Sequence, residues 1–184
     1  KVSASPHLME GIFPEFLRRY GQRHPNVQVK LNDTVDPEQL AMLEGGDIDL
    51  AQALVRAIPP QAQHFASHLL QPTDMLAACH PSLNLGKGAT IDIARLAPYP
   101  LLQISTAFVI RRTFDAACRL AGFRANNVLE SHAPHALLAL AAAGHGVAII
   151  PSALRTHYYK LRIVRVTYRG KPLREELTIL SDKR

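Results

Sequence analysis

The segment 137–151, "LLALAAAGHGVAIIP", constrains the fold of this chain more than any other stretch. Residues 137–143 form a strongly helix-favouring run, and residues 147–150 are apolar and partly β-branched. Gly144 follows the last helical alanine, where a left-handed residue needs to lack a Cβ, and Gly146 lets the backbone pass close to a sheet. Pro151 ends the strand because proline cannot donate a ladder hydrogen bond. The segment therefore predicts a helix that leads directly into a central strand of an α/β sheet.

The first third of the chain alternates strand and helix signals. Strands are predicted at residues 1–5, 27–31 and 48–55, the second from an alternation of apolar and polar residues. Two helices are predicted between these strands. The first is capped by Ser5 and begun by Pro6, is kinked or delayed near Gly11 and Pro14, and ends at Gly21. The second is capped by Asp36, begun by Pro37 and ended by Gly45 and Gly46. This alternation implies parallel strands with right-handed crossovers.

A proline-marked break at residues 58–63 separates a second half of similar architecture, although no sequence repeat relates the two. Strands are predicted at 75–79, 101–104, 128–130, 147–150, 163–166 and 177–180, and helices at 91–96, capped by Thr90, and at about 108–121, stopped by Gly122. The last strand is expected to cross back to the first sheet. The prediction is therefore an α/β protein of two Rossmann-like lobes joined by a two-stranded hinge, lobe I being residues 1–72 with 174–184 and lobe II residues 73–173.

Candidate binding residues lie where predicted parallel strands end, because open α/β sheets bind ligands at the carboxyl ends of their strands. Ala133 caps the helix that begins at Pro134 and offers its N–H groups no side-chain acceptor, so this helix start is suited to an anion. A water-capped helix end is an equally good explanation of that feature alone. Three other loops follow predicted parallel strands, at Ser5 to His7, at Asp33 and Thr34, and at Ser105 and Thr106. Each of them taken singly is more often an ordinary helix cap. The candidate residues are Ser5, Pro6, His7, Asp33, Thr34, Ser105, Thr106, Ser131 and His132.

Composition excludes several classes of function. The formal charge is +6, but the basic residues are scattered, so no nucleic-acid-binding stripe is predicted. No apolar run is long enough to span a bilayer, and no membrane partner is expected. The two cysteines, Cys79 and Cys118, lie outside any CxxC pattern and are predicted to be buried thiols in a reducing, cytoplasmic compartment.

Signals for metal, cofactor or enzymatic chemistry are weak. The pair His132 and His135 could face a metal from one helical turn, but helix-end histidines are the better interpretation because no third ligand lies nearby in sequence. Asp47 and Asp49 are interpreted as a polar entry into a strand rather than a cation site. The chain lacks the nucleophile-elbow, zincin and P-loop motifs. No cofactor, metal or catalytic residue is predicted.

Several segments together resemble the effector-binding domain of LysR-type transcriptional regulators. The stretches "FPEFLRRYGQRHPNVQVKL" and "LAMLEGGDIDLAQALV" are similar to the first lobe of that family. The stretch "MLAACHPSLNLGKGATIDIARLAPYPLL" resembles its hinge-to-second-lobe segment, and "RRTFDAACRLAGF" with "LLALAAAGHGVAIIPSAL" resembles its second lobe. The likeness covers nearly the whole chain, and its specificity lies in the order and spacing of these segments.

The resemblance implies a fold like that of type-II periplasmic binding proteins. It implies a small-molecule inducer held between the lobes, with family contacts carried over to Ser5 and its neighbours, Thr34, Ser105 with Thr106, and the Ser131–His132 region. It also implies a DNA-binding winged helix-turn-helix before Lys1 and a homodimer or homotetramer. The family closes with a C-terminal helix that this chain lacks, so we expect a chain trimmed at both ends. Phe108 places an aromatic ring near the cleft and leaves the identity of the ligand open.

The leading hypothesis from the sequence is a non-enzymatic, cytoplasmic sensor domain of a bacterial transcription regulator that binds a small carboxylate. Arg56 or Arg111 is a weaker candidate for clamping that carboxylate. A transport-associated solute-binding protein of the same fold is the second hypothesis. A small lyase or transferase is the third, with Asp33 and either His7 or His132 as its acid-base pair.

Overall fold

The structure is a computed structural model that describes residues 1–34 and 36–182, without the side chains of residues 36, 37 and 63. The chain folds into two compact units. Unit 1 comprises Lys1–Pro72 and Glu175–Arg184, and unit 2 comprises Thr73–Arg174. The chain therefore passes between the units twice. In the described residues, no helix combines the length and apolarity that crossing a membrane requires.

Unit 1 contains a five-stranded mixed sheet in the order β2-β1-β3-β13-β4. Its strands are β1 (Val2–Ala4), β2 (Leu31–Asp33), β3 (Leu50–Leu54), β4 (Ala66–Leu69) and β13 (Leu177–Ser181). Strand β1 pairs in parallel with β2 and β3, as the alternation of strands and helices predicted. Strand β13 pairs antiparallel with β3 and β4, which confirms that the last strand crosses back to the first sheet.

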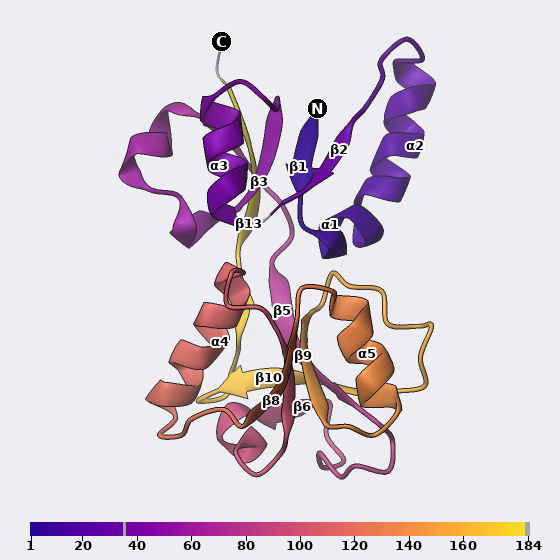
Figure 1. The fold of residues 1–184 in the computed structure, drawn as a ribbon, viewed down its shortest axis with the longest axis vertical. Helices are drawn as coiled ribbons and strands as arrows, with labels where there is room; N and C mark the ends of the chain where they lie inside the picture. Colours follow the sequence, from indigo (N-terminus) through magenta and orange to yellow (C-terminus); the bar gives the residue numbers. More distant parts are fainter. Residues whose placement is uncertain (35, 183–184) are drawn as a thin grey trace. The chain divides into compact units, whose positions relative to one another are not determined.

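Helices cover both faces of this sheet. Helices α2 (Phe13–Arg23) and α3 (Asp36–Glu44) lie on opposite sides of it in Figure 1, and the short α1 (Pro6–Gly11) precedes α2. Two 3-10 helices, η1 (Val55–Ala57) and η2 (Pro60–His64), occupy the proline-marked break. The core on the α3 side is formed by buried side chains of α3, the sheet and η2: Leu43, Ile48, Ala51, Ala62, Phe65 and Leu180.

The structure corrects several predicted boundaries in unit 1. The helix continues past Gly21 to Arg23, because the backbone ladder persists until the His24 N–H donates to the Tyr20 carbonyl at 2.9 Å. The strand predicted at 27–31 lies instead at residues 31–33, because these are the residues that pair in parallel with the three residues of β1. Strand β3 starts at Leu50 rather than residue 48, and edge strand β4 was not predicted. The predicted cap at Asp36 lies outside the described side chains.

Unit 2 is built on a second mixed sheet in the order β11-β10-β5-β9-β7-β8, with β6 beside β10 and β12 beside β5. Strands β7 and β8 are parallel, as are β7 and β9, whereas β5 runs antiparallel to β9 and β10. The strands are β5 (Thr73–Cys79), β6 (Thr90–Asp92), β7 (Leu101–Ile104), β8 (Asn127–Ser131), β9 (Val147–Pro151), β10 (Arg162–Tyr168), β11 (Lys171–Pro172) and β12 (Arg174–Glu175).

Helices α4 (Val109–Leu120) and α5 (Pro134–Ala142) lie on opposite sides of the unit 2 sheet (Figure 1). Of the helix predicted over 91–96 and capped by Thr90, only residues 93–96 are helical, and the predicted start and cap are wrong. Thr90 begins β6 instead, and the 3-10 helix η3 (Ile93–Leu96) is capped by the Asp92 carboxylate, which accepts from the Ala94 N–H at 3.0 Å. Strand β6 forms because β10 pairs with it in parallel, a contact distant in sequence.

The segment 137–151 folds as predicted. Helix α5 ends before Gly144, which has a φ of 87°, and β9 begins at Val147 with all five residues buried. Gly146 has a φ of 155°, and a Cβ at this position would lie 2.4 Å from the carbonyl oxygen of Pro100. That carbonyl accepts from the Val147 N–H at 2.9 Å. The hydrogen bond that begins β9 therefore requires the close approach of Gly146 to Pro100.

Candidate functional site

The loop after β1 in unit 1 is organised by a buried glutamine of β3. The Oε1 atom of Gln52 accepts two hydrogen bonds from Ser5, from the backbone N–H at 2.8 Å and from the hydroxyl at 2.7 Å. The Ser5 hydroxyl also lies 3.1 Å from Nε2 of His7. Ser5 is the N-cap of α1 and Pro6 its first residue, as predicted, but the Ser5 side chain makes no capping hydrogen bond. Both hydrogen-bond donors of Ser5 are therefore committed within the protein.

The second predicted loop of unit 1 follows β2. The hydroxyls of Thr34 and Ser3 are hydrogen-bonded to each other, and the Thr34 carbonyl accepts from Nε2 of Gln39 at 2.6 Å. Gln39 is buried, and its Oε1 has no hydrogen-bond partner among the described residues. Asp33, the last residue of β2, is exposed.

Burial lowers the pKa of His7 to about 4, because an imidazolium loses its hydration in this site. Partial burial raises the pKa of the Asp33 carboxyl. Within the described part of the chain, no hydrogen bond or ion pair joins Asp33 to His7. The geometry therefore does not support Asp33 and His7 as the acid-base pair of the enzyme hypothesis.

The loop after β7 in unit 2 is organised by a carboxylate from the neighbouring strand β8. The Arg111 guanidinium, at 3.0 Å, holds the pKa of the Glu130 carboxyl below its usual range, and hydrogen bonds from the Ser105 hydroxyl and the Thr106 backbone act in the same direction. Thr106 is exposed, whereas Ser105 is buried. The Ser105 hydroxyl and the Thr106 backbone N–H are thus already directed at a carboxylate of the protein itself.

Helix α5 begins beside the same loop. Its N-cap is Ala133, which supplies no side-chain acceptor, as predicted. The Ser131 hydroxyl partly replaces the missing cap by accepting from the Ala133 N–H at 3.0 Å, and the Ser131 carbonyl accepts from the Ser105 N–H at 3.0 Å. His132 is exposed, with its ring centroid 5.9 Å from that of Phe108. Ser105, Ser131 and His132 are therefore brought together at the carboxyl ends of β7 and β8.

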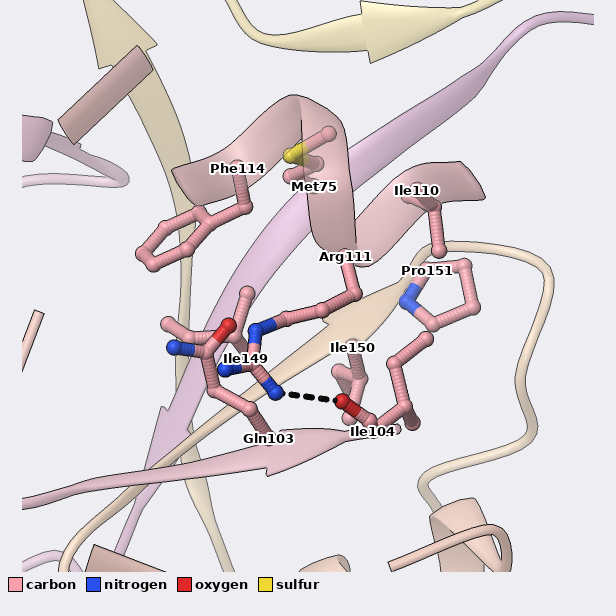
Figure 2. Close-up of a pocket in the computed structure, with 9 residues that line it drawn as sticks. All are labelled: Met75, Gln103, Ile104, Ile110, Arg111, Phe114, Ile149, Ile150 and Pro151. Carbon is pink, nitrogen blue, oxygen red and sulfur yellow. Dashed lines mark hydrogen bonds between the residues drawn. The ribbon is translucent and has the colours of Figure 1, made fainter. Parts of the chain in front are cut away.

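Both arginines considered as a clamp already form ion pairs within the protein. Arg111 is buried and donates to the Ile104 carbonyl at 2.8 Å (Figure 2). It also bonds Asp115 at 2.9 Å in addition to Glu130. Arg56 pairs with the buried Glu175 at 2.7 Å.

The cavity beside Arg111 measures only about 10 Å³, room for about one water molecule. It is too small for a metabolite, and its lining consists of Met75, Gln103, Ile104, Ile110, Arg111, Phe114, Ile149, Ile150 and Pro151.

Other chemistry receives no support from the described residues. Among them, no three side chains of His, Cys, Asp or Glu gather as a metal ion requires. Cys79 and Cys118 are free and buried, as predicted. Burial and the neighbouring Asp115 raise the pKa of the Cys118 thiol to about 12, which keeps it protonated and unreactive.

Sequence reasoning missed the residues that hold the two loops. Gln52 and Glu130 sit inside strands, at 3% and 45% exposure, and nothing local distinguishes them from other strand residues. One signal was available for Gln52: a polar side chain in a predicted buried strand requires hydrogen-bond partners. It did not identify Ser5, which is 47 residues away.

Comparison with known proteins assigns the family. The model described as the LysR substrate binding domain matches the chain over residues 1–184. The chain belongs to this family. Among curated relatives, this LysR substrate-binding domain is 28% identical over 160 residues to the HTH-type transcriptional regulator AlsR of Bacillus subtilis, a match that covers 85% of the chain and 50% of AlsR. The domain spans about half the length of the curated relatives it matches.

Solved structures share the fold of this LysR substrate-binding domain. The C-terminal domain of a probable LysR family regulator from Rhodococcus sp. RHA1 matches with a TM-score of 0.84 at 18% identity, covering 99% of this chain and 89% of that one. The effector-binding domain of QuiR in complex with shikimate matches with a TM-score of 0.83 at 14% identity, covering 99% and 86%. The predicted two-lobed fold is thereby confirmed.

Proposed function

We propose that this domain is the effector sensor of a bacterial transcription regulator and that its effector is a small carboxylate. The observation that carries the proposal is the start of α5, where the N-cap Ala133 has no side-chain acceptor and the helix end lies beside Ser105 and Ser131. A helix N-terminus has a positive potential, which favours an anion. The complex of the QuiR domain with shikimate is consistent with a ligand of this size in this fold.

The names of the curated relatives support the role of the domain in regulation, since they describe HTH-type transcriptional regulators rather than transport proteins or enzymes. We infer that a DNA-binding segment elsewhere in the full-length protein reads out the bound state, that the regulator works in the cytoplasm as a homodimer or homotetramer, and that the domain catalyses no reaction. An effector can shift such a system only through its difference in affinity for two conformations.

Thermal unfolding of the domain against acetate, succinate, benzoate, shikimate and inorganic phosphate tests this proposal. A ligand at about 100 times its Kd adds roughly 2.7 kcal/mol to the free energy of unfolding. We expect at least one carboxylate to raise Tm while sodium chloride at equal ionic strength does not. If no carboxylate changed Tm at tens of millimolar, the effector class would be wrong.

A further inference from the structure

The hydrogen bonds around Ser5 fix the orientation of the Gln52 amide. The Ser5 backbone N–H can only donate, so the Gln52 atom that faces it at 2.8 Å must be the oxygen. The same oxygen receives the Ser5 hydroxyl proton at 2.7 Å. With Oε1 committed to Ser5, the amide plane turns the two Nε2–H donors away from that residue. The orientation of this amide therefore follows from its partners.

The Nε2 group of Gln52 is available to a ligand. Within the described residues it donates no hydrogen bond. Three buried side-chain atoms there lack a partner, namely Gln39 Oε1, Asp115 Oδ1 and Glu175 Oε1, and Gln52 Nε2 is not one of them. It therefore has access to solvent, although the residue as a whole is only 3% exposed. A strand residue that is otherwise buried thus presents one free polar group.

The side-chain hydrogen bonds that link His7, Ser5 and Gln52 are all donated in the same direction along this series. Because the Ser5 hydroxyl gives its proton to Gln52, it can only accept at the 3.1 Å contact with His7 Nε2, which must carry a hydrogen. Protons thus point from His7 to Ser5, from Ser5 to Gln52, and from Gln52 outward. Hydrogen bonds in such a chain polarise one another, which strengthens the terminal donor. The cluster is arranged to present a donor to an oxygen acceptor.

We propose that Gln52 binds the effector directly, donating from Nε2 to a carboxylate or hydroxyl oxygen, and that Ser5 is a positioning residue that holds the Gln52 amide. This inference rests on the proposed function and refines it, because the sequence had placed Ser5 itself against the ligand. A substitution of Gln52 therefore acts on affinity and ligand class, whereas one of Ser5 acts through the amide orientation.

The sharpest variant is Gln52→Glu, because its Oε1 still accepts both Ser5 donors while its second oxygen replaces the outward donor with a negative acceptor. We expect calorimetric titration with benzoate and shikimate to show at least a tenfold loss of affinity for whichever compound binds the wild-type domain. Gln52→Met, which removes the amide without adding charge, is expected to lose about fivefold. Ser5→Ala is expected to lose less than Gln52→Glu, and Ser5→Thr, which restores the hydroxyl, to recover the loss.

Two controls separate this role from a structural one. In the wild-type domain, the ¹⁵N–¹H resonances of the Gln52 side-chain amide should shift on titration, a readout that requires no variant to fold. His68 lines an apolar hollow of about 300 Å³ elsewhere in unit 1, so His68→Gln should leave the affinity unchanged. Unchanged affinity in folded Gln52→Glu, a static amide resonance, or a loss of binding in His68→Gln would each overturn the proposal while leaving the effector function intact. Failure of the wild-type domain to bind any tested carboxylate would overturn both.

Discussion

The Cβ position of Gly146 lies 2.4 Å from the carbonyl oxygen of Pro100, a distance that no side-chain carbon tolerates. The contact joins the turn after α5 to the residue before β7. Because the same carbonyl accepts the first hydrogen bond of β9, the turn cannot move away without breaking the strand pairing.

Gly146→Ala is expected to lower the free energy of unfolding by about 2–4 kcal/mol, combining overpacking with an unfavourable φ. Chemical denaturation monitored by circular dichroism measures this. The matched control is Gly144→Asn, at a φ of 87° with open space around its Cβ position, which should cost less than about 1 kcal/mol. Equal losses in the two variants would show that the close approach to Pro100 is unimportant.

The stability of the domain should depend on pH through His7. Its folded pKa of about 4 lies below the unfolded value of about 6.5, so the neutral form is favoured by folding. The contribution of His7 to the free energy of unfolding is fully present above pH 6.5. It declines by up to about 3 kcal/mol as the pH falls toward 4. Urea titrations between pH 7 and 4 should show this loss in the wild type and a shallower one in His7→Gln. The exposed His145→Gln should retain the wild-type slope.

Removal of the Arg111 guanidinium should destabilise unit 2. Arg111→Met leaves Asp115 and Glu130 without their cation, and we expect a loss of about 3 kcal/mol, since isolating one member of a buried ion pair is costly. Asp115→Asn in the same chain should recover part of the loss, measured by a double-mutant cycle. The exposed Arg119→Met serves as the comparison and should change stability by less than about 0.5 kcal/mol. A coupling energy near zero between Arg111→Met and Asp115→Asn in this double-mutant cycle would contradict the importance of the ion pair.

A negative charge at the start of α5 should stabilise the helix and compete with the effector. Ser131→Asp keeps an acceptor near the Ala133 N–H and adds a charge that the helix dipole favours, so Tm should rise slightly. If the effector carboxylate binds at this helix end, its affinity should fall at least tenfold, as titration calorimetry would show. Ser131→Asn, which keeps an acceptor without the charge, should bind nearly as well as the wild type. Equal affinity in Ser131→Asp and the wild type would place the carboxylate elsewhere.

Local sequence signals determined much of the fold. Glycine and proline at 144, 146 and 151 marked the end of α5 and both limits of β9, because their conformational restrictions act within a few residues. The same kind of signal located β7, α4 and the uncapped start of α5. Boundary errors occurred where the deciding partner was distant, as at β6, whose pairing with β10 overrode a capping pattern at Thr90.

For the candidate site, the sequence by itself determined which loops follow parallel strands and where a helix starts without a cap. Only the tertiary structure decided which side chains those loops bind. Gln52 takes both donors of Ser5, and Glu130 takes the Ser105 hydroxyl and the Thr106 backbone N–H, so the hydroxyls of both serines are engaged within the protein. Hydrogen bonds between separate strands depend on sheet register and rotamer, which are set by packing across the whole unit. The free Nε2 donor of Gln52 in unit 1 can therefore be identified only from the tertiary structure.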